Sequence, residues 1–220
     1  MKKIALLLLT LALGVAPLRL WSSETSLKPN EALEKLIQGN QRFVAGQNTH
    51  PNIDETRRNQ VASGQTPFAV ILGCADSRVP PETIFDQGLG DLFSVRVAGN
   101  TLDDIILGSV EYATKVLHSP LIVVLGHQKC GAVEAALSKE EKPGHIGFIT
   151  DEIKTAMKTV TCDPKDQPTC AIRANVTWVV DELNKSTPIL KPLIDEGKLR
   201  VVGAYYNLET GKVEFLGEKR

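Results

Sequence analysis

Short apolar runs alternate along this chain with longer segments in which apolar residues recur at helical spacing. The runs are rich in Val, Ile and Leu and end at glycine or polar residues, which predicts strands buried inside a parallel sheet. They cover residues 67–73, 92–97, 121–126 and 201–206. The segments with helical periodicity cover residues 30–45, 54–63, 103–118, 132–138, 145–160 and 171–186. Because strands and helices alternate, we predict an α/β fold with a central, mostly parallel β-sheet flanked by helices.

Two segments carry more specific expectations. Thr210-Gly211 is a turn signal directly before the apolar run 213–216, which is therefore predicted to be an antiparallel edge strand near the C-terminus. In the segment 103–118, Asp103 or Asp104 is expected to cap a helix. Its apolar face should contain Ile105, Ile106, Val110, Ala113 and Leu117.

The N-terminus has the pattern of an export signal. Lys2 and Lys3 precede an apolar run over residues 4–16, which is too short for a comfortable membrane span. We expect a signal peptide at residues 1–23, cleaved somewhere between 16 and 23, and a periplasmic or secreted protein without stable membrane insertion. An uncleaved membrane anchor is the alternative. Residues 24–220 should then form a single domain with an N-terminal helical arm at about 30–63.

Composition excludes several functions. Hydrophobic residues make up 42% of the 220 residues, which is enough for a sizeable core. Lys and Arg number 25 against 26 Asp and Glu, for a formal net charge of -1, and no basic stretch indicates a nucleic-acid partner. The chain also has no glycine-rich phosphate loop.

Metal-ligating residues follow two of the predicted strands. Cys74 comes directly after 67–73, and His127 and Cys130 come directly after 121–126. Thiolates and imidazole are the donors that Zn²⁺ favours, and three protein ligands leave one tetrahedral position open, as in catalytic sites. We therefore predict a zinc site at Cys74, His127 and Cys130. The alternative is that both cysteines and the histidine are ordinary core residues.

Asp76 and Arg78 lie two and four residues after the first cysteine. In an extended chain these two side chains lie on the same side, where the guanidinium can bind the carboxylate through two hydrogen bonds. Asp76 could then accept a hydrogen bond from a metal-bound hydroxide, or it could itself become a fourth ligand in a closed site. We predict catalytic roles for both residues; the alternative is a purely structural ion pair.

The remaining cysteines suggest a disulfide. Cys162 and Cys170 enclose a polar loop with two prolines, and export would place them in an oxidising compartment. We predict that they are bonded to each other. The rival pairing of Cys74 with Cys130 would destroy the proposed metal site.

The stretches CADSRVPPE (74–82) and GHQKCGAV (126–133) resemble the two signature blocks of the β-class carbonic anhydrases, and the resemblance covers about residues 30–217. It implies a zinc metalloenzyme, a lyase, that reversibly hydrates carbon dioxide to bicarbonate and a proton through attack of zinc-bound hydroxide. It also implies a homodimer or a dimer-based larger oligomer. N-terminal helices of this family reach onto a partner subunit, although the sequence itself equally permits packing on the chain's own sheet.

The same resemblance implies substrate-binding residues at Gln65, Phe93, Tyr112 and Gly131. For Phe93 and Tyr112, plain core packing is the alternative. Ile71 stands where the bicarbonate-regulated branch has tryptophan, which puts that branch's regulatory anion pocket in doubt. Two rival functions are hydrolysis of carbon disulfide or carbonyl sulfide on the same zinc site, and a non-catalytic zinc-stabilised scaffold.

Overall fold

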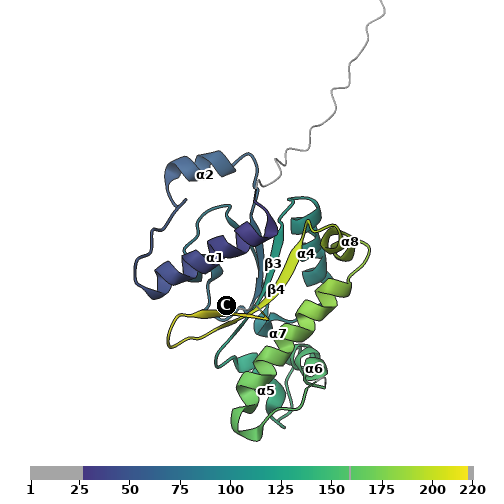
Figure 1. The fold of residues 1–220 in the computed structure, drawn as a ribbon. Coiled ribbons are helices and arrows are strands. Elements are labelled where there is room, and N and C mark those ends of the chain that lie inside the picture. The colour runs from purple at the N-terminus through teal and green to yellow at the C-terminus, as the bar shows by residue number, and fades with distance from the viewer. Residues whose placement is uncertain (1–26, 159, 218–220) are drawn as a thin grey trace, which may run out of the picture.

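A five-stranded sheet in the order β2-β1-β3-β4-β5 organises the computed structural model, which describes residues 27–158 and 160–217 (Figure 1). Its first four strands are parallel and β5 is antiparallel to β4, which confirms the predicted fold class. The strands are β1 (Ala69–Gly73), β2 (Leu92–Arg96), β3 (Leu121–His127), β4 (Arg200–Tyr206) and β5 (Val213–Leu216).

Helices surround this sheet on both faces. The α-helices are α1 (Pro29–Val44), α2 (Glu55–Val61), α3 (Pro81–Ile84), α4 (Asp104–Lys115), α5 (Gly131–Leu137), α6 (Ile146–Met157), α7 (Gln167–Lys185) and α8 (Leu190–Asp195). Two 3₁₀ turns, η1 (Ala98–Asn100) and η2 (Pro164–Asp166), complete the set. The short elements α3, α8, η1 and η2 were not predicted, because three to six residues are too few to show a helical period. The expected signal peptide lies outside the described residues.

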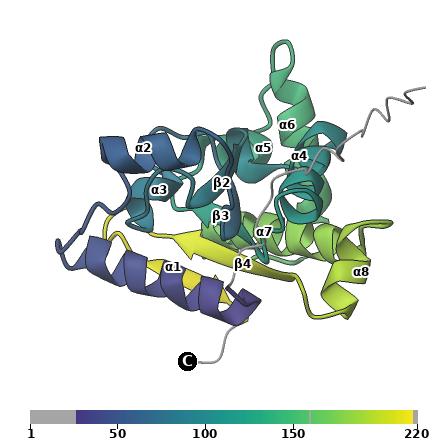
Figure 2. The same ribbon diagram turned by 90° about the horizontal axis from the view of Figure 1, so that it is seen from above.

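Alternate residues of each strand supply two separate cores. Ile71 and Val123 belong to the core that also contains Leu36 of α1, whereas Leu72 and Val124 belong to the core that contains Val179 of α7. This follows from the two-residue period of a strand, since successive side chains point to opposite faces. Accordingly, α1 and α7 lie on opposite sides of the sheet (Figure 2).

Helix α7 approaches the sheet closely because two facing positions are glycine. A Cβ atom added at Gly126 or Gly203 would lie 2.6 or 2.9 Å from a methyl carbon of Val176. Any larger residue would push α7 away from β3 and β4 and open a gap in a tightly packed core.

The N-terminal helices pack in different ways. Helix α1 buries Ala32, Leu33 and Leu36 in a core of its own chain, so within one chain it packs on the home sheet. Helix α2 buries no residue, and Ile53 just before it is 63% exposed. Helix α2 and its flanking loop therefore leave surface that could contact another chain.

Helix α4 forms as predicted, but one residue of its predicted apolar face is exposed. Asp103 caps it by accepting a hydrogen bond from the amide of Ile106, as expected. Val110 and Ala113 are fully buried, but Ile105 is 79% exposed, so its assignment to the buried face is wrong. Ile106 and Leu107 in the same turn pack against the core, so Ile105 is exposed because it points to a different side of the helix.

The disulfide between Cys162 and Cys170 is confirmed, with a Cα–Cα distance of 5.7 Å. It ties the loop after α6 to the first turn of α7. Within residues 27–158 and 160–217, none of the helices has both the length and the apolar character needed to span a bilayer.

A buried carboxylate fastens the end of α1 to the loop after α3. The side chain of Asp86 is inaccessible to solvent and accepts hydrogen bonds from the amides of Thr49 and His50, from the Thr49 hydroxyl and from the Arg42 guanidinium, whose Nε lies 2.6 Å away. Burial alone would raise the pKa of this carboxyl group, but these donors outweigh it and hold the pKa well below its usual range. The charged form is therefore the one that the fold stabilises.

We predict that Asp86→Asn lowers the free energy of unfolding at pH 7 by about 2–4 kcal/mol, because it leaves the Arg42 charge and several buried donors without an anion. Urea unfolding measures the loss. Asp151→Asn, which removes an exposed ion pair with Lys154, is the control and should cost less than about 1 kcal/mol.

The pH dependence has a definite sign. A carboxyl group whose pKa is lower in the folded than in the unfolded state stabilises the fold at pH values above its unfolded pKa of about 3.9. This stabilisation is lost as the pH falls towards the folded-state pKa. The difference between the parent and Asp86→Asn should therefore be constant near neutral pH and shrink below about pH 4. A difference that stays unchanged down to pH 3 would show that the charge of Asp86 is not what stabilises the fold.

Candidate metal centre

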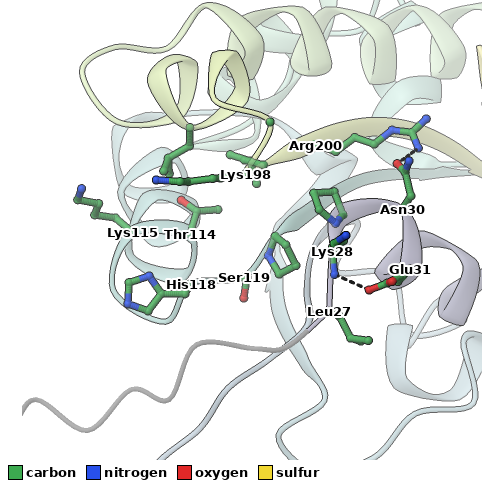
Figure 3. A pocket seen from close by; sticks show the side chains of 15 residues that line it. Leu27, Lys28, Asn30, Glu31, Thr114, Lys115, His118, Ser119, Lys198 and Arg200 are labelled. Carbon is green, nitrogen blue, oxygen red and sulfur yellow. Dashed lines mark hydrogen bonds between the residues drawn. The ribbon is translucent and has the colours of Figure 1, made fainter.

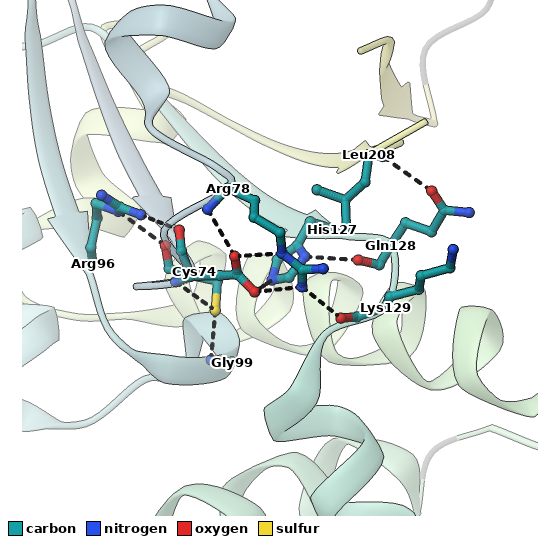
Figure 4. Close-up of polar contacts among 9 residues, drawn as sticks. Cys74, Arg78, Arg96, Gly99, His127, Gln128, Lys129 and Leu208 are labelled. Atoms are coloured by element: carbon teal, nitrogen blue, oxygen red, sulfur yellow. Dashed lines mark hydrogen bonds and ion pairs between the residues drawn. The ribbon is translucent and has the colours of Figure 1, made fainter. Parts of the chain in front are cut away.

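Strands β1 and β3 are neighbours in the sheet, and the candidate site lies beyond their carboxyl ends. Gly73 pairs with Leu125, so the residues that follow each strand emerge side by side (Figure 4). The chain goes from β1 to the sheet edge at β2 and then returns to the other side of β1, which makes this a topological switch point. Crevices at such points are where open α/β sheets bind ligands.

The structure brings the three predicted metal ligands together. One donor atom each from Cys74, His127 and Cys130 lies within 4.8 Å of the other two, and all three side chains are buried. Cys74 follows β1, His127 ends β3 and Cys130 immediately precedes α5. Two thiols and an imidazole at this spacing could hold a zinc-like cation and leave one coordination position open.

The imidazole of His127 is already oriented for ligation. Its Nδ1 lies 2.9 Å from the carbonyl oxygen of Gln128, and because a carbonyl can only accept, Nδ1 carries the proton. The lone pair then resides on Nε2, which is buried and has no hydrogen-bond partner among the described residues. A buried acceptor without a partner is costly, and a cation would satisfy it.

The sulfur of Cys74 is surrounded by donors. The amides of Asp76 and Gly99 lie 3.4 and 3.2 Å from Sγ, and the thiol of Cys130 also donates to it. The hydrogen bond from Cys130 is the largest factor that lowers the pKa of Cys74. The same bond and burial raise the pKa of Cys130. A cation bound at this site would replace the thiol proton and hold both sulfurs as thiolates.

Gly99 can approach the sulfur because it lacks a side chain. Its φ of +72° lies in the left-handed region, and a Cβ atom there would come within 2.8 Å of the Ile153 side chain. The buried amide of Asn175 donates to the Gly99 carbonyl over 2.8 Å and fixes this turn. The amide of Gly99 is thus held in place as a donor to Cys74.

Asp76 and Arg78 form the predicted two-bond pair. Nε of Arg78 lies 2.9 Å from Oδ1 and its terminal nitrogen lies 2.7 Å from Oδ2, while the Arg78 amide also donates to Oδ1. Chiefly through the side-chain hydrogen bond of Arg78, the pKa of Asp76 is lowered to about 2. Oδ2 lies 3.9 Å from Nε2 of His127, so an anionic acceptor borders the cluster across the whole neutral pH range.

Arg96 was not predicted, yet it holds the same loop from the other side. Its Nε donates to the carbonyl of Cys74 over 3.0 Å, and its terminal nitrogen donates to the carbonyl of Asp76 over 2.6 Å. A signal was present in the sequence, since Arg96 ends an apolar strand just as Cys74 follows one. These two bonds fix the loop backbone on which a ligand and its neighbouring carboxylate stand.

The turn between β4 and β5 supports the second ligand loop. The amide of Gln128 donates to the Tyr206 carbonyl over 2.9 Å, and its side-chain oxygen accepts from the Leu208 amide over 3.1 Å. Lys129, with φ of +52°, forms an ion pair with Glu209, and its carbonyl accepts a hydrogen bond from Arg78. Two successive carbonyls, of Gln128 and Lys129, therefore orient His127 and Arg78 (Figure 4).

Three predicted substrate-binding residues are not brought to the cluster of their own chain. Gln65 precedes β1 and is exposed, whereas Cys74 follows the opposite end of that strand. Phe93 pairs with Val70 in the amino-terminal half of the sheet, and its ring lies 6.3 Å from that of the half-exposed Tyr112. Gln65 therefore lies more than the length of β1, about 16 Å, from the metal site, and Phe93 lies about 10 Å from it along the strand. Gly131 alone adjoins the cluster, at the start of α5.

Comparison with known proteins gives a consistent result. The family model described as carbonic anhydrase matches residues 69–213. The chain is 43% identical over 190 residues to carbonic anhydrase 2 of Mycobacterium tuberculosis, covering 84% of this chain and 91% of that protein. It is 41% identical to a carbonic anhydrase of Mycolicibacterium smegmatis, covering 84% of this chain and 92% of that protein. Among solved structures, a tetrameric β-carbonic anhydrase of Sordaria macrospora superposes with a TM-score of 0.67 at 28% identity, covering 80% and 90% of the two chains.

We predict that Gln128→Ala weakens zinc binding by about tenfold or more, because the loop whose carbonyl orients His127 loses its side-chain hydrogen bond to the β4–β5 turn. Competition with a chelator of known affinity measures the effect. Gln128→Glu keeps an oxygen that can accept from Leu208 but loses the amide that donates to Glu209, and it should recover part of the affinity. Glu182→Gln, the control, removes only an exposed ion pair with Lys185 on α7 and should leave the affinity within about twofold of the parent. Parental zinc affinity in Gln128→Ala would show that the turn does not position the ligand.

Proposed function

Because the chain belongs to the β-class carbonic anhydrases, we propose that it interconverts carbon dioxide and bicarbonate with one zinc ion held by Cys74, His127 and Cys130. The observation that carries this proposal is the buried set of three donors at the β1/β3 switch point. Nε2 of His127 is buried there without a hydrogen-bond partner among the described residues. A purely structural zinc site would close with a fourth protein ligand.

Zinc in such a site supplies Lewis acidity, which lowers the pKa of a coordinated water from 15.7 to about 7. Two thiolate ligands neutralise the formal charge of the cation and reduce this effect, so the surrounding groups have to assist. Asp76 is the ionised group nearest the cluster, and its charge is available as a hydrogen-bond acceptor at every pH at which the enzyme would work. We assign Asp76 the role of orienting the attacking hydroxide by accepting a hydrogen bond from it.

Arg78 controls where the Asp76 carboxylate lies. Carboxylate oxygen is itself a zinc ligand, and Asp76 stands only two residues from Cys74, so it can compete for the open position. The guanidinium engages both carboxylate oxygens and is itself held by the Lys129 carbonyl. We assign Arg78 the role of keeping Asp76 off the cation, which keeps the site open.

Gln65, Phe93 and Tyr112 are assigned to the substrate site of a second copy of the chain. Within one chain Gln65 lies at the opposite end of β1 from Cys74, and Phe93 packs against the core on the other face of the sheet, so we expect these residues to contribute across a subunit interface. The exposed Ile105 and Val116 lie seven residues before and four residues after Tyr112, which places them on the same face of α4. The Sordaria macrospora relative is described as tetrameric, and we propose that this chain is likewise a homo-oligomer built from dimers.

We also propose that residues 1–23 are an export signal and that residues 24–220 form the mature enzyme. The Cys162–Cys170 disulfide is consistent with an oxidising compartment. Cys74 and Cys130, although buried together, are not bonded to each other, and ligation to a cation would protect them from oxidation.

Stopped-flow hydration of carbon dioxide by metal-quantified protein tests the function. We expect zinc-dependent turnover with one zinc per chain, and we expect Cys130→Ser to lose zinc and at least about 99% of the activity, because two protein ligands hold zinc poorly. Carbonyl sulfide and carbon disulfide are assayed in parallel. Full metal content in Cys130→Ser would contradict the ligand assignment, and turnover of the sulfur substrates without carbon dioxide hydration would contradict the reaction.

We predict that Arg78→Ala keeps its zinc but loses about tenfold or more of the hydration rate between pH 6 and 9, because Asp76 is released towards the cation. Arg78→Lys should recover little, since an ammonium cannot make the planar two-bond contact. Arg173→Ala is a matched control, because it removes a similar two-bond pair with Glu214 on the outer surface and should leave the rate near that of the parent. If Arg78→Ala retains both zinc and parental activity throughout this range, the Asp76–Arg78 pair is only structural.

A further inference from the structure

Two backbone amides donate to the sulfur of Cys74, and they come from different parts of the chain. The Asp76 amide lies 3.4 Å from Sγ and belongs to the loop that Cys74 itself begins. The Gly99 amide lies closer, at 3.2 Å, and comes from the turn that follows β2 (Figure 4). In a buried site such N–H groups stabilise negative charge on the sulfur, which is the form that binds a metal cation. The direction of the Gly99 amide therefore matters for the metal centre.

The backbone of Gly99 does not fix this direction by itself. Its φ of +72° and ψ of 15° are accessible to glycine without strain, but glycine also has more conformational freedom than any other residue. Asn175 supplies a restraint, since its Nδ2 donates to the Gly99 carbonyl oxygen over 2.8 Å. Because a carbonyl can only accept, the side-chain atom at this distance is the amide nitrogen. Gly99 is thus bonded on both flanks, to Cys74 through its amide and to Asn175 through its carbonyl.

Helix α7 holds Asn175 in a fixed position beside this turn. The Cys162–Cys170 disulfide ties the first turn of the helix to the preceding loop, and Asn175 lies little more than one turn further on. Val176, the next residue, packs so closely on the sheet that a Cβ atom would not fit at either of the two sheet glycines that it faces. A shift of α7 would disrupt this close packing, so the helix presents the Asn175 side chain as a rigid donor.

Asparagine is an unfavourable choice at this position for stability alone. It is a weak helix former, because its side chain competes for the hydrogen bonds of the backbone. Asn175 is 1% exposed, and its Oδ1 has no hydrogen-bond partner among the described residues. Buried polar atoms without partners destabilise a fold. Departures from these rules are expected at functional sites, and Gly99 alone links Asn175 to the sulfur of Cys74.

We propose that Asn175 is a positioning residue of the metal centre, which keeps the Gly99 amide directed at the Cys74 sulfur. The inference rests on the ligand set proposed above. It adds a contact from α7, a helix that carries none of the three ligands. Without this restraint Gly99 can turn its amide away, and the buried thiolate then loses a donor. Because a cation binds the thiolate form, its affinity should fall.

Chelator competition on the mature protein tests the proposal with Zn²⁺ as the probe. Asn175→Leu removes the donor and keeps a side chain of similar size. It should weaken zinc binding about tenfold or more, as the loss of hydrogen bonds around metal ligands does in general. Asn175→Ala removes the same donor without adding bulk, and it should weaken zinc binding to a similar extent. This second variant tests the proposal even if leucine prevents folding.

Cobalt substitution provides a readout that a purely structural role of Asn175 would not change. In the Co²⁺-loaded protein, the energy of the thiolate-to-cobalt charge-transfer band reports how strongly hydrogen bonds stabilise the sulfur electrons. Loss of the Gly99 hydrogen bond removes part of this stabilisation, so the band should move to longer wavelength in Asn175→Leu and Asn175→Ala. Absence of any thiolate band from the Co²⁺-loaded parent would contradict the ligand assignment and, with it, this inference.

Two control variants reduce stability but keep the Asn175 bond. Ser119→Ala deletes a buried hydrogen bond to the Pro67 carbonyl, and Ser119 lines a cavity at the opposite edge of the sheet (Figure 3). Val179→Ala opens a gap in the core under α7, one turn beyond Asn175. Both should keep the cobalt band in place and the zinc affinity within about twofold of the parent, because neither side chain donates to the metal centre. Parental zinc affinity in a folded Asn175 variant, an unshifted cobalt band in that variant, or an equal loss of affinity in Val179→Ala would overturn the proposal.

Discussion

The parallel pairing of β1 with β3 is the constraint on which the rest of this structure depends. Because Gly73 lies opposite Leu125, the chain leaves both strands at the same height of the sheet and over the same crevice. Cys74 and His127 thus become neighbours although 52 residues separate them in the sequence, and Cys130 follows on the first turn that leads into α5. The buried faces of the two strands enforce this register, since a slip by one residue would exchange the two cores on opposite sides of the sheet.

The loops beyond these strands are fixed by polar contacts rather than by apolar packing. Arg96 holds the carbonyls of Cys74 and Asp76, and the turn between β4 and β5 holds Gln128 and Lys129. These contacts oppose a real cost, because Lys129 adopts a left-handed conformation that non-glycine residues rarely occupy. Such a cost is consistent with a site in which the positions of the metal ligands and of the Asp76–Arg78 pair matter more than local stability.

The two edges of the sheet have opposite electrostatic characters. At the carboxyl edge, two thiols and the Asp76 carboxylate form a recess suited to a cation. At the amino edge, a separate cavity is lined by lysine, arginine and histidine side chains and by Glu31. A parallel sheet makes this separation possible, because all four parallel strands begin at one edge and end at the other.

The sequence by itself determined the elements and the chemistry of the ligands. Buried strands reveal themselves through continuous runs such as 121–126, and residue types such as Cys74 and His127 carry their donor properties wherever they lie. The pairing of Cys162 with Cys170 was also predictable, because only a short polar loop separates them. Tertiary structure alone decided which residues from distant segments meet. It placed the Gln128 side chain on the Leu208 amide, exposed Ile105 at the end of a helix with an apolar pattern, and set Gln65 at the far edge of the sheet from Cys74. These outcomes depend on strand order and on which side of a helix faces the sheet, and local periodicity leaves both undetermined where apolar residues occupy adjacent positions such as Ile105 and Ile106.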